Sequence, residues 1–298
     1  LLKRFLNGIG GFTDQVNTYS NAAGTVILPY VVGNAEAIYV GSSWDGLIRD
    51  SELIVMFGGA PLKNLQVAGG GPGMHMGEEW LRRAKEAGIE FVNIAPLRDD
   101  AADFLGAEWI HPRPNTDTAL MLGMAHTLAE EGLHDPSFLE RYCTGYDRFE
   151  SYLMGRGDGQ PKDADWAASI TDVGAGRIRA LARRMAASRT MIMTNWSLQR
   201  ADHGEQPFWM TITLAAMLGQ IGLPGGGFGF GYGSMCGMGG PRERIATPRM
   251  HAGRNPTGSF IPVARISDMF LNPGGRYEYN GEARTFPDIR LVYWCGGN

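Results

Sequence analysis

The chain is poor in cysteine, and its cysteines are not spaced as metal ligands. Only Cys143, Cys236 and Cys295 occur among the 298 residues, and no Cys-x-x-Cys pair is present. This spacing excludes a four-thiolate zinc site and the ligand set of an iron–sulfur cluster from this segment. A chain of this size also does not depend on a disulfide scaffold.

Several other signals are missing as well. The longest apolar run, 25–32, is too short to span a bilayer. The net charge is −4 and no basic stripe is present, which argues against a nucleic-acid surface. No P-loop, no G-x-G-x-x-G after a strand and no G-x-S-x-G elbow occurs, so these nucleotide-binding and hydrolase motifs are absent.

What the sequence does contain is an alternation of apolar runs and helical patterns. Continuous apolar runs bounded by Gly or Pro are typical of strands buried on both faces, and parallel strands are joined by crossovers that are usually helices. The pattern therefore predicts an α/β core. The expected strands are 51–58, 89–96, 108–112 and 190–196, and the expected helices are 77–87, 116–131, 136–143, 175–187 and 205–222. The glycine-rich stretch 225–260 lacks periodicity and is expected to be a long loop.

Polar residues follow the ends of the expected strands. Ligands of parallel sheets bind at the carboxyl ends of the strands. The stretches there are "GGAPLKN" (58–64), "IAPLRDD" (94–100), "HPRPNTD" (111–117) and "NWSLQRADHGEQ" (195–206). The last of them is dense in hydrogen-bonding groups, which favours a polar, nucleotide-like ligand.

Each candidate residue also has an ordinary structural interpretation. Lys63 can face an anion beside a glycine turn, or be a surface lysine. Arg98 can face a phosphate. Asp117 can accept the two N–H bonds of a guanine edge, or be an N-terminal helix charge with Thr116 as the cap. Ser20 can be a helix cap, a nucleophile or a metal ligand, and the residues alone leave this open.

Six segments in order resemble one family. They are "GGFT" with "YSNAAGTVILPYVVG" within 10–33, "PNTDTALMLGMAHTL" at 114–128, "NWSLQRADHGEQ" at 195–206, "LAAMLGQIGLPGGGFG" at 214–229, "IPVARISDM" at 261–269 and "YWCGGN" at 293–298. The chain thereby resembles the dimethyl sulfoxide reductase family of molybdopterin oxidoreductases. Its S-oxide and N-oxide reductase subgroup, which includes dimethyl sulfoxide, trimethylamine N-oxide and biotin sulfoxide reductases, is the most similar.

The resemblance implies a cofactor and a set of site residues. The family's cofactor is molybdenum held by two molybdopterin guanine dinucleotides. Ser20 matches the serine that ligates the metal in this subgroup, and a hard alkoxide suits a high-valent metal. Positions matching cofactor contacts are Ala60, Lys63, Asn64, Pro96, Arg98, Thr116, Asp117, Trp196, Ser197, Leu198, Gln199, Arg200, His203, Gly296, Gly297 and Asn298. Ala95 departs from the pattern, because the family often has Asp there, and one nucleotide contact is expected to be missing or relocated.

The resemblance also implies a reaction and a domain plan. The expected reaction is reduction of an S-oxide or N-oxide by oxygen-atom transfer to molybdenum, with electrons from a cytochrome, a flavoprotein or a reduced nicotinamide. The alternatives are an enzyme of the formate dehydrogenase or nitrate reductase type, and a non-catalytic nucleotide-binding module. Residues 29–235 are expected to form a dinucleotide-binding-like domain, and 1–28 with 236–298 part of a second α/β domain.

The resemblance leaves the compartment open. Members of the family are considerably longer, so the chain is expected to be an internal fragment that does not hold the complete cofactor alone. Some relatives are periplasmic and others are cytoplasmic, and sequence beyond this segment would decide between them.

Overall fold

The computed structural model describes residues 1–68, 73–241, 248 and 250–295, and it divides into two units. The first unit combines Leu1–Ala22 with Glu243–Asn298, and the second is Ala23–Arg242. These units are defined by contacts within the chain, and the domain boundaries predicted at 28/29 and 235/236 stay a prediction. Each unit is described by itself.

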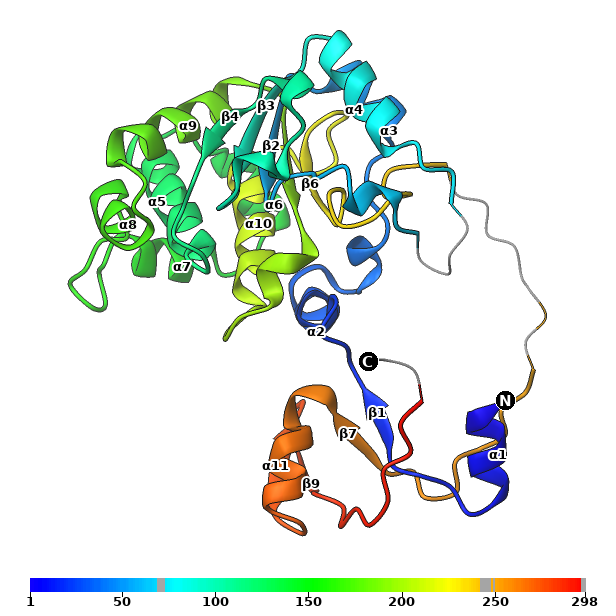
Figure 1. Cartoon of the computed structure of the whole chain (residues 1–298). Coiled ribbons are helices and arrows are strands. Elements are labelled where there is room, and N and C mark those ends of the chain that lie inside the picture. Colours follow the sequence, from blue (N-terminus) through cyan, green and yellow to red (C-terminus); the bar gives the residue numbers. More distant parts are fainter. Residues whose placement is uncertain (69–72, 242–247, 249, 296–298) are drawn as a thin grey trace. The chain divides into compact units, whose positions relative to one another are not determined.

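The second unit is built on a five-stranded parallel sheet (Figure 1). Its strand order is β4-β3-β2-β5-β6, with β2 at the centre. The strands are β2 (Leu53–Phe57), β3 (Glu90–Ile94), β4 (Glu108–Ile110), β5 (Thr190–Thr194) and β6 (Gly227–Phe230). Every residue of β2 and of β5 is buried, as expected for continuous apolar strands covered on both faces.

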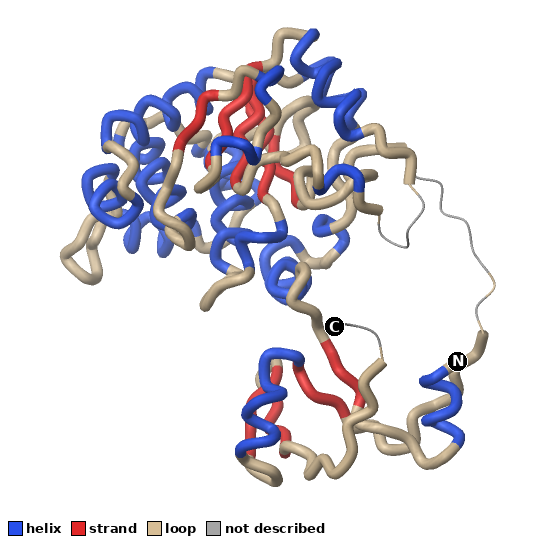
Figure 2. Tube along the Cα trace, in the orientation of Figure 1, coloured by secondary structure: helices blue, strands red, loops and turns tan. Residues whose placement is uncertain are grey.

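Helices cover both faces of this sheet, as Figure 2 shows in blue around the red strands. On one face Leu53, Val55 and Phe57 of β2 pack in a core with α5 to α10. On the other face Ile54 and Met56 pack with α3 and α4. The helices of the second unit are α2 (Ala22–Val32), α3 (Trp44–Asp50), α4 (Gly77–Glu86), α5 (Asp117–Glu130), α6 (Pro136–Tyr142), α7 (Tyr146–Leu153), α8 (Ala164–Thr171), α9 (Ala175–Ala187) and α10 (Gln206–Met217), and its short 3-10 helices are η1 (Glu36–Ile38), η2 (Asn64–Gln66), η3 (Arg98–Asp100), η4 (Asp103–Leu105) and η5 (Trp196–Gln199).

Helix ends follow local sequence signals. Helix α4 is followed by Gly88, which adopts a φ of 87°. Glycine reaches this left-handed conformation with little steric strain because it has no Cβ. Asp135 caps α6 by accepting a hydrogen bond from the Phe138 amide, with Pro136 at the first helical position. Pro29 lies inside α2, where it removes one helical N–H donor.

The α/β prediction is confirmed, but the glycine-rich stretch was misjudged. The segment predicted as a loop over 225–260 contains β6, which pairs in parallel with β5 through the register Met191↔Gly227 to Thr194↔Phe230. Half of its "GFGF" sequence is glycine, which is depleted in strands and masks the alternating Phe residues. Glycine is required here by packing, because a Cβ at Gly229 would lie 2.5 Å from the Tyr232 ring. Helix α10 also ends at Met217, before the predicted end at 222.

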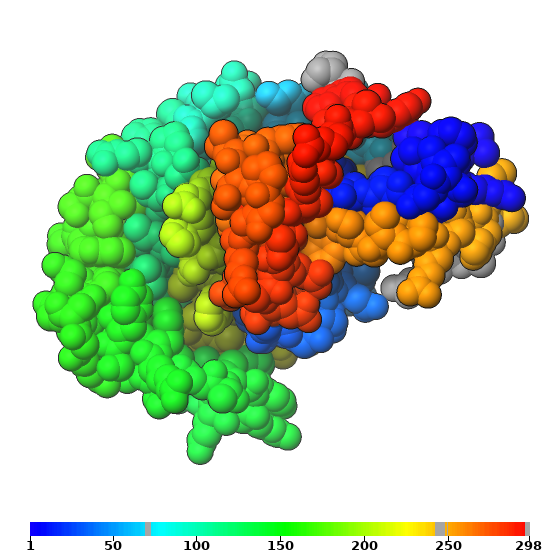
Figure 3. Space-filling view, turned by 90° about the horizontal axis from the view of Figure 1, so that it is seen from below, coloured from blue at the N-terminus to red at the C-terminus, as the bar shows by residue number. Residues whose placement is uncertain are grey.

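The first unit has a much smaller framework. Its parallel pair joins β1 (Asp14–Val16) to β7 (Phe260–Pro262), and its antiparallel pair joins β8 (Arg276–Tyr279) to β9 (Glu282–Thr285). The helices are α1 (Leu2–Gly8), η6 (Val263–Arg265) and α11 (Ile266–Leu271). The buried core consists of Ile261, Met269, Tyr277 and Phe286. In the space-filling view the blue N-terminal residues lie against the orange residues that precede β7 (Figure 3).

Candidate functional site

The carboxyl edge of the sheet has its topological switch between β2 and β5. From β2 the chain builds β3 and β4 on one side, then returns to build β5 and β6 on the other. Crevices for ligands open at such a point, outside the carboxyl ends of the two strands. The predicted stretches 58–64 and 195–206 follow β2 and β5, and 94–100 and 111–117 follow β3 and β4. The sheet therefore brings all four stretches to one edge.

The turn after β2 is shaped by two glycines. Gly58 and Gly59 have φ values of 85° and 68°. A Cβ on Gly59 would lie 2.3 Å from the carbonyl oxygen of Asp100, so no larger residue fits without movement. The amide of Ala60 donates to that same carbonyl at 2.6 Å, which fixes the buried Ala60 against η3. The turn is thus held by backbone contacts to the neighbouring loop.

Lys63 and Asn64 follow this turn with different roles. Lys63 is exposed. Asn64 donates from Nδ2 to the carbonyl of Gly233 at 3.1 Å, so this amide group joins the turn to the loop after β6. Burial raises the pKa of Asp100, and the nearby charge of Lys63 opposes that rise. Lys63 therefore carries an exposed positive charge, whereas the uncharged Asn64 is bonded to the neighbouring loop.

Asn195 is an organising residue that the sequence analysis did not single out. It is 4% exposed and follows β5 directly. Its Nδ2 donates to the carbonyls of Gly58 and Gly59, both at 2.7 Å. Its Oδ1 accepts from the amide of Gly233 at 2.9 Å and from the hydroxyl of Ser234 at 3.3 Å. One side chain therefore joins the turns after β2, β5 and β6. An Asn immediately after a buried strand was the available signal.

The stretch after Asn195 forms η5. Trp196 is half-buried, and its Nε1 is a buried donor that has no hydrogen-bond partner among the described residues. Gln199 is buried and accepts the amide of Ala23 at the start of α2, at 2.8 Å. Ser197 and Arg200 are exposed, and Leu198 is half-buried. The stretch thus presents an indole N–H, a hydroxyl and a guanidinium near the switch point.

His203 lies on an exposed turn. Its side chain is 78% exposed, and its φ of 54° is in the left-handed region. Its ring nitrogens lie 3.9 Å from Asp202 and 3.8 Å from Glu205. It is therefore surrounded by carboxylates rather than packed as a structural histidine.

Pro96 and Arg98 follow β3 on the surface. Both are exposed, and within the described ranges Arg98 forms no salt bridge. The buried Asn93 donates to the carbonyl of Arg98 at 3.2 Å and so holds the loop at its base. Ala95 is fully buried, and its carbonyl accepts from Nε1 of Trp109 at 2.9 Å. The residue that departs from the family pattern, Ala95, is therefore buried and is held through its backbone carbonyl.

Asp117 is the first residue of α5. It is half-buried, and burial raises the pKa of its carboxyl to about 6. Its own backbone N–H partly opposes this rise. Thr116 stands at the N-cap position, but its hydroxyl donates to the Arg113 carbonyl at 2.6 Å and makes no cap bond. The helix thus begins with a poorly solvated acid and without the side-chain cap considered above.

The remaining predicted residues belong to the first unit. Ser20 belongs to the first unit and is exposed, and its hydroxyl has no partner among the described residues. Its amide donates to Oγ1 of Thr18 at 3.2 Å. Gly296, Gly297 and Asn298 lie outside the described residues. Within the described ranges no group of three or more His, Cys, Asp and Glu side chains could hold a metal ion, and no helix is long and apolar enough to cross a membrane.

A large cavity lies among the helices of the second unit, with Gln206 of the stretch 195–206 in its lining. It has a volume of about 1240 Å³ and is lined from α2, α6, α7 and α10, with Tyr30, Phe138, Tyr146, Phe149 and Trp209 among the lining residues. None of the predicted site residues lines it. Its aromatic lining is poorly suited to phosphate groups, which need cationic or N–H donors.

The comparisons with known proteins identify the family. The family model described as "Molybdopterin oxidoreductase" matches residues 1–296. The chain belongs to the molybdopterin oxidoreductase family. It is 51% identical over 299 residues to a biotin sulfoxide reductase of Cereibacter sphaeroides, covering 100% of this chain and 40% of that protein. A dimethyl sulfoxide/trimethylamine N-oxide reductase of the same organism is 44% identical over 308 residues, covering 100% of this chain and 37% of the relative.

Further relatives agree with this assignment. A trimethylamine-N-oxide reductase of Haemophilus influenzae is 43% identical over 309 residues, covering 100% of this chain and 37% of that protein. Among solved structures, an acetylene hydratase from Pelobacter acetylenicus matches with a TM-score of 0.55 and 22% identity over 74% of this chain and 27% of that one, which supports the fold alone. The chain spans about two fifths of the length of the curated relatives it matches.

The residues at the sheet edge fit a molybdopterin cofactor. The buried Trp196 Nε1 lacks a partner in the described part of the chain, so it can donate to a ligand. Arg98 and Arg200 are exposed cations without salt bridges among the described residues, which suits phosphates. Asp117 is a poorly solvated acceptor. Donors, cations and an acceptor along one edge of the sheet are the groups that a pterin carrying phosphates requires.

Proposed function

We propose that this chain is part of a molybdenum-dependent enzyme that reduces an S-oxide or an N-oxide. The main support is similarity along its whole length to proteins named biotin sulfoxide, dimethyl sulfoxide and trimethylamine-N-oxide reductases, at 43% to 51% identity. The similarity extends over 100% of the chain in all three comparisons. The substrate class, rather than one substrate, is what these three names have in common.

We propose further that the cofactor is the guanine dinucleotide form, held at the edge described above. Lys63, Arg98 and Arg200 would face its phosphates, and the indole N–H of Trp196 would donate to it. Asp117 in its ionised form would accept from a guanine edge, which donates two N–H bonds side by side. Ala60, Pro96, Ser197, Leu198 and Gln199 would shape the surface around these groups, and Gly296, Gly297 and Asn298 stay predicted contacts outside the described residues.

Ser20 is the proposed ligand of the metal. Its hydroxyl is exposed and has no partner in the described ranges, so no internal hydrogen bond would have to break when it binds. An oxygen ligand suits a hard, high-valent metal better than a thiolate. When bound, the cofactor supplies two-electron oxygen-atom transfer, and the protein supplies orientation and electronic tuning. A cytochrome, a flavoprotein or a reduced nicotinamide would supply the electrons.

The decisive experiment uses the full-length protein, produced in a host that makes the cofactor. Molybdenum content, guanine nucleotide released by acid and reduction of dimethyl sulfoxide, biotin sulfoxide and trimethylamine N-oxide with a reduced dye would be measured together. We expect molybdenum, guanine nucleotide and turnover of at least one oxide. Asp117→Ala should lower the nucleotide and metal content, whereas Asp45→Ala, an exposed acid on α3, should not.

Each other result has a definite meaning. A protein without molybdenum or tungsten would contradict the proposal. Bound guanine nucleotide without metal and without turnover would favour the non-catalytic nucleotide-binding module. Molybdenum together with formate oxidation or nitrate reduction, and no turnover of the three oxides, would keep the cofactor and replace the substrate class.

A further inference from the structure

The segment that leads to Ser20 is placed by very little regular structure. Its strand β1 has three residues, paired with β7 in the register Asp14↔Phe260 to Val16↔Pro262. Gly10 and Gly11 precede it with φ values of 126° and 91°, and Asn17 follows it with a φ of 67°. A strand this short contributes few ladder hydrogen bonds. Its register must therefore depend on contacts outside the strand.

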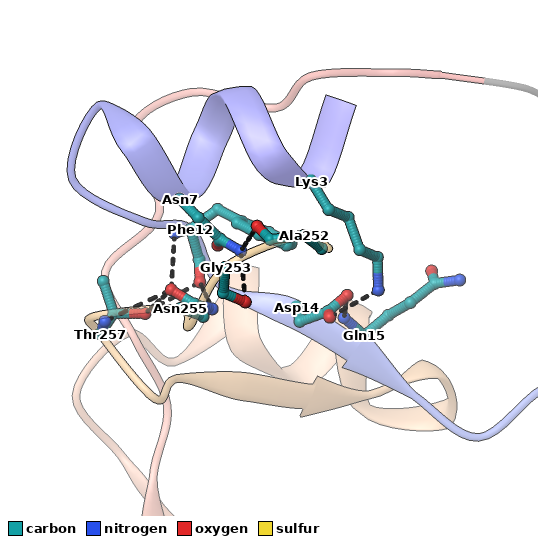
Figure 4. Close-up of polar contacts among 9 residues, drawn as sticks. All are labelled: Lys3, Asn7, Phe12, Asp14, Gln15, Ala252, Gly253, Asn255 and Thr257. Carbon is teal, nitrogen blue, oxygen red and sulfur yellow. Dashed lines mark hydrogen bonds and ion pairs between the residues drawn. The ribbon is translucent and has the colours of Figure 1, made fainter. Parts of the chain in front are cut away.

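Asn255 supplies such contacts to Phe12, two residues before the strand (Figure 4). Its Nδ2 donates to the carbonyl of Phe12 at 2.7 Å, and its Oδ1 accepts from the amide of Phe12 at 3.3 Å. The side-chain amide thus pairs with both backbone groups of Phe12, as a strand partner would. A Cβ on Gly11 would lie 2.5 Å from Oδ1 of Asn255, so glycine is needed for this approach.

Thr257 completes this arrangement, which we name the Phe12 clamp (Phe12, Asn255 and Thr257). Its hydroxyl donates to the Phe12 carbonyl at 2.9 Å and lies 3.0 Å from Oδ1 of Asn255. Its amide donates to the same Oδ1 at 3.3 Å. The clamp is continuous with the strand pair, because the amide of Asp14 donates to the Ser259 carbonyl at 3.0 Å. It therefore sets the register in which β1 meets β7.

The far side of the Ser20 segment is attached to the same part of the chain. The hydroxyl of Tyr19 donates to the carbonyl of Val263, directly after β7, at 3.1 Å. Ser20 itself is held through its amide, by Oγ1 of Thr18. Since the Ser20 hydroxyl has no partner in the described residues, its place depends on the backbone, apart from rotation about χ1. The backbone in turn is placed by the clamp at one end and by Tyr19 at the other.

We propose that Asn255 and Thr257 are positioning residues for Ser20: by pairing with Phe12 they fix the register of β1, and so the place of the Ser20 hydroxyl as a metal ligand. The inference rests on the proposed function. A slip or tilt of the strand would displace the oxygen, and displacements of about 1 Å at a reacting centre can lower rates by about a hundredfold. The clamp residues themselves need not touch the metal or the substrate.

The test uses the full-length, cofactor-loaded protein with matched variants. Asn255→Ala removes the amide, and Thr257→Val removes the hydroxyl at nearly constant volume. The controls are Asn7→Ala, which removes another half-buried amide that bonds to the Ala252 carbonyl at 2.9 Å, and Thr257→Ser, which keeps the hydroxyl. Molybdenum content, the paramagnetic resonance spectrum of the half-reduced metal, kcat and KM, and hydrogen exchange of residues 12–21 in cofactor-free protein would be measured.

We expect Asn255→Ala and Thr257→Val to retain molybdenum and to shift its paramagnetic spectrum. In both variants kcat should fall by about tenfold or more with little change in KM, and exchange of residues 12–21 should be faster. Asn7→Ala and Thr257→Ser should match the wild type in all of these. An unchanged spectrum in both clamp variants would overturn the inference and leave the proposed function standing. Loss of metal in both, together with a lower melting temperature, would also overturn it, because the clamp would then act on folding alone. A wild type without molybdenum would contradict the proposed function, and the inference with it.

Discussion

The two units place their candidate residues by different physical means. In the second unit, five paired parallel strands deliver the turns to one edge of the sheet, and two large cores support them. In the first unit, a strand of three residues and a core of four buried side chains support the segment that carries Ser20. Side-chain hydrogen bonds to the backbone, from Asn255, Thr257 and Tyr19, do there what strand pairing does in the second unit.

This difference predicts different responses to mutation. Many strand hydrogen bonds and core contacts together fix the turns at a sheet edge. Removing one exposed group from the edge should therefore leave its geometry intact. A segment placed by individual hydrogen bonds should lose its geometry when one of them is removed, with little loss of global stability. The predictions below test this contrast, and they begin with the largest effect.

The largest effect is expected for Ser20→Ala in the full-length enzyme. The metal would lose an anionic oxygen ligand, so turnover should fall by orders of magnitude and the absorption and paramagnetic spectra should change. Ser20 is exposed, so the melting temperature should hardly move. Ser20→Cys should retain more metal, because a thiolate also ligates, but with a different spectrum. Near-normal turnover with unaltered spectra in Ser20→Ala would refute the ligand assignment.

A large loss of stability is expected for Asn195→Ala. The change leaves the carbonyls of Gly58 and Gly59 and the amide of Gly233 without their buried partner. We expect a loss of about 2–4 kcal/mol in the free energy of unfolding, measured by urea denaturation. Ser197→Ala, which changes an exposed residue of the same loop, is the control and should lie within about 0.5 kcal/mol of the wild type. Equal effects of the two changes would show that Asn195 does not organise the edge.

Asp117→Asn should alter the pH dependence of stability. The pKa of this carboxyl is raised from its ordinary value to about 6, so ionisation in the folded state is costly. The cost is fully present above pH 6, shrinks as the pH falls through 6, and is absent below the unfolded value near 4. The Asn variant should therefore be more stable by up to about 2 kcal/mol at pH 8 and equal to the wild type at pH 4. Unfolding curves at both values check this, and a gap that widens at low pH would contradict it.

The smallest effect is expected for Lys3→Ala. Lys3 and Asp14 form an ion pair at 2.7 Å in the first unit, and the lysine side chain is 62% exposed. Such pairs contribute only a few tenths of a kcal/mol, and salt screens them. The variant should leave both stability and the metal spectrum unchanged. A spectral change as large as that of Asn255→Ala would mean that charge, rather than backbone pairing, places the strand.

The sequence predicted the second unit better than the first. The runs 51–58 and 190–196 contain the continuously apolar stretches 53–57 and 191–193 because both faces of the sheet are covered, and this signal is local. The strand β6 was missed because half of "GFGF" is glycine, which is depleted in strands. Its Gly229 is required by Tyr232, which packs on it from outside the strand. Long-range packing of this kind leaves no trace in local periodicity.

The site shows the same limit. The four polar stretches could be found because each follows a predicted strand. Asn195 and Asn255 could not be assigned their roles, since their partners lie 136 and 243 residues away in the chain. The local sequence around a loop Asn does not show whether its side chain faces solvent or joins three turns. Only the fold brings the paired backbone groups to it.

Asn195 has a consequence for how a ligand would meet this edge. Because one side chain joins the turns after β2, β5 and β6, these turns are ordered in the chain alone. A cofactor arriving there would find the backbone of the edge already in place, and little conformational entropy would be lost on binding. Under the proposed function, affinity at such a preorganised edge would depend mainly on the exposed side chains of Lys63, Arg98 and Arg200, which become ordered on binding.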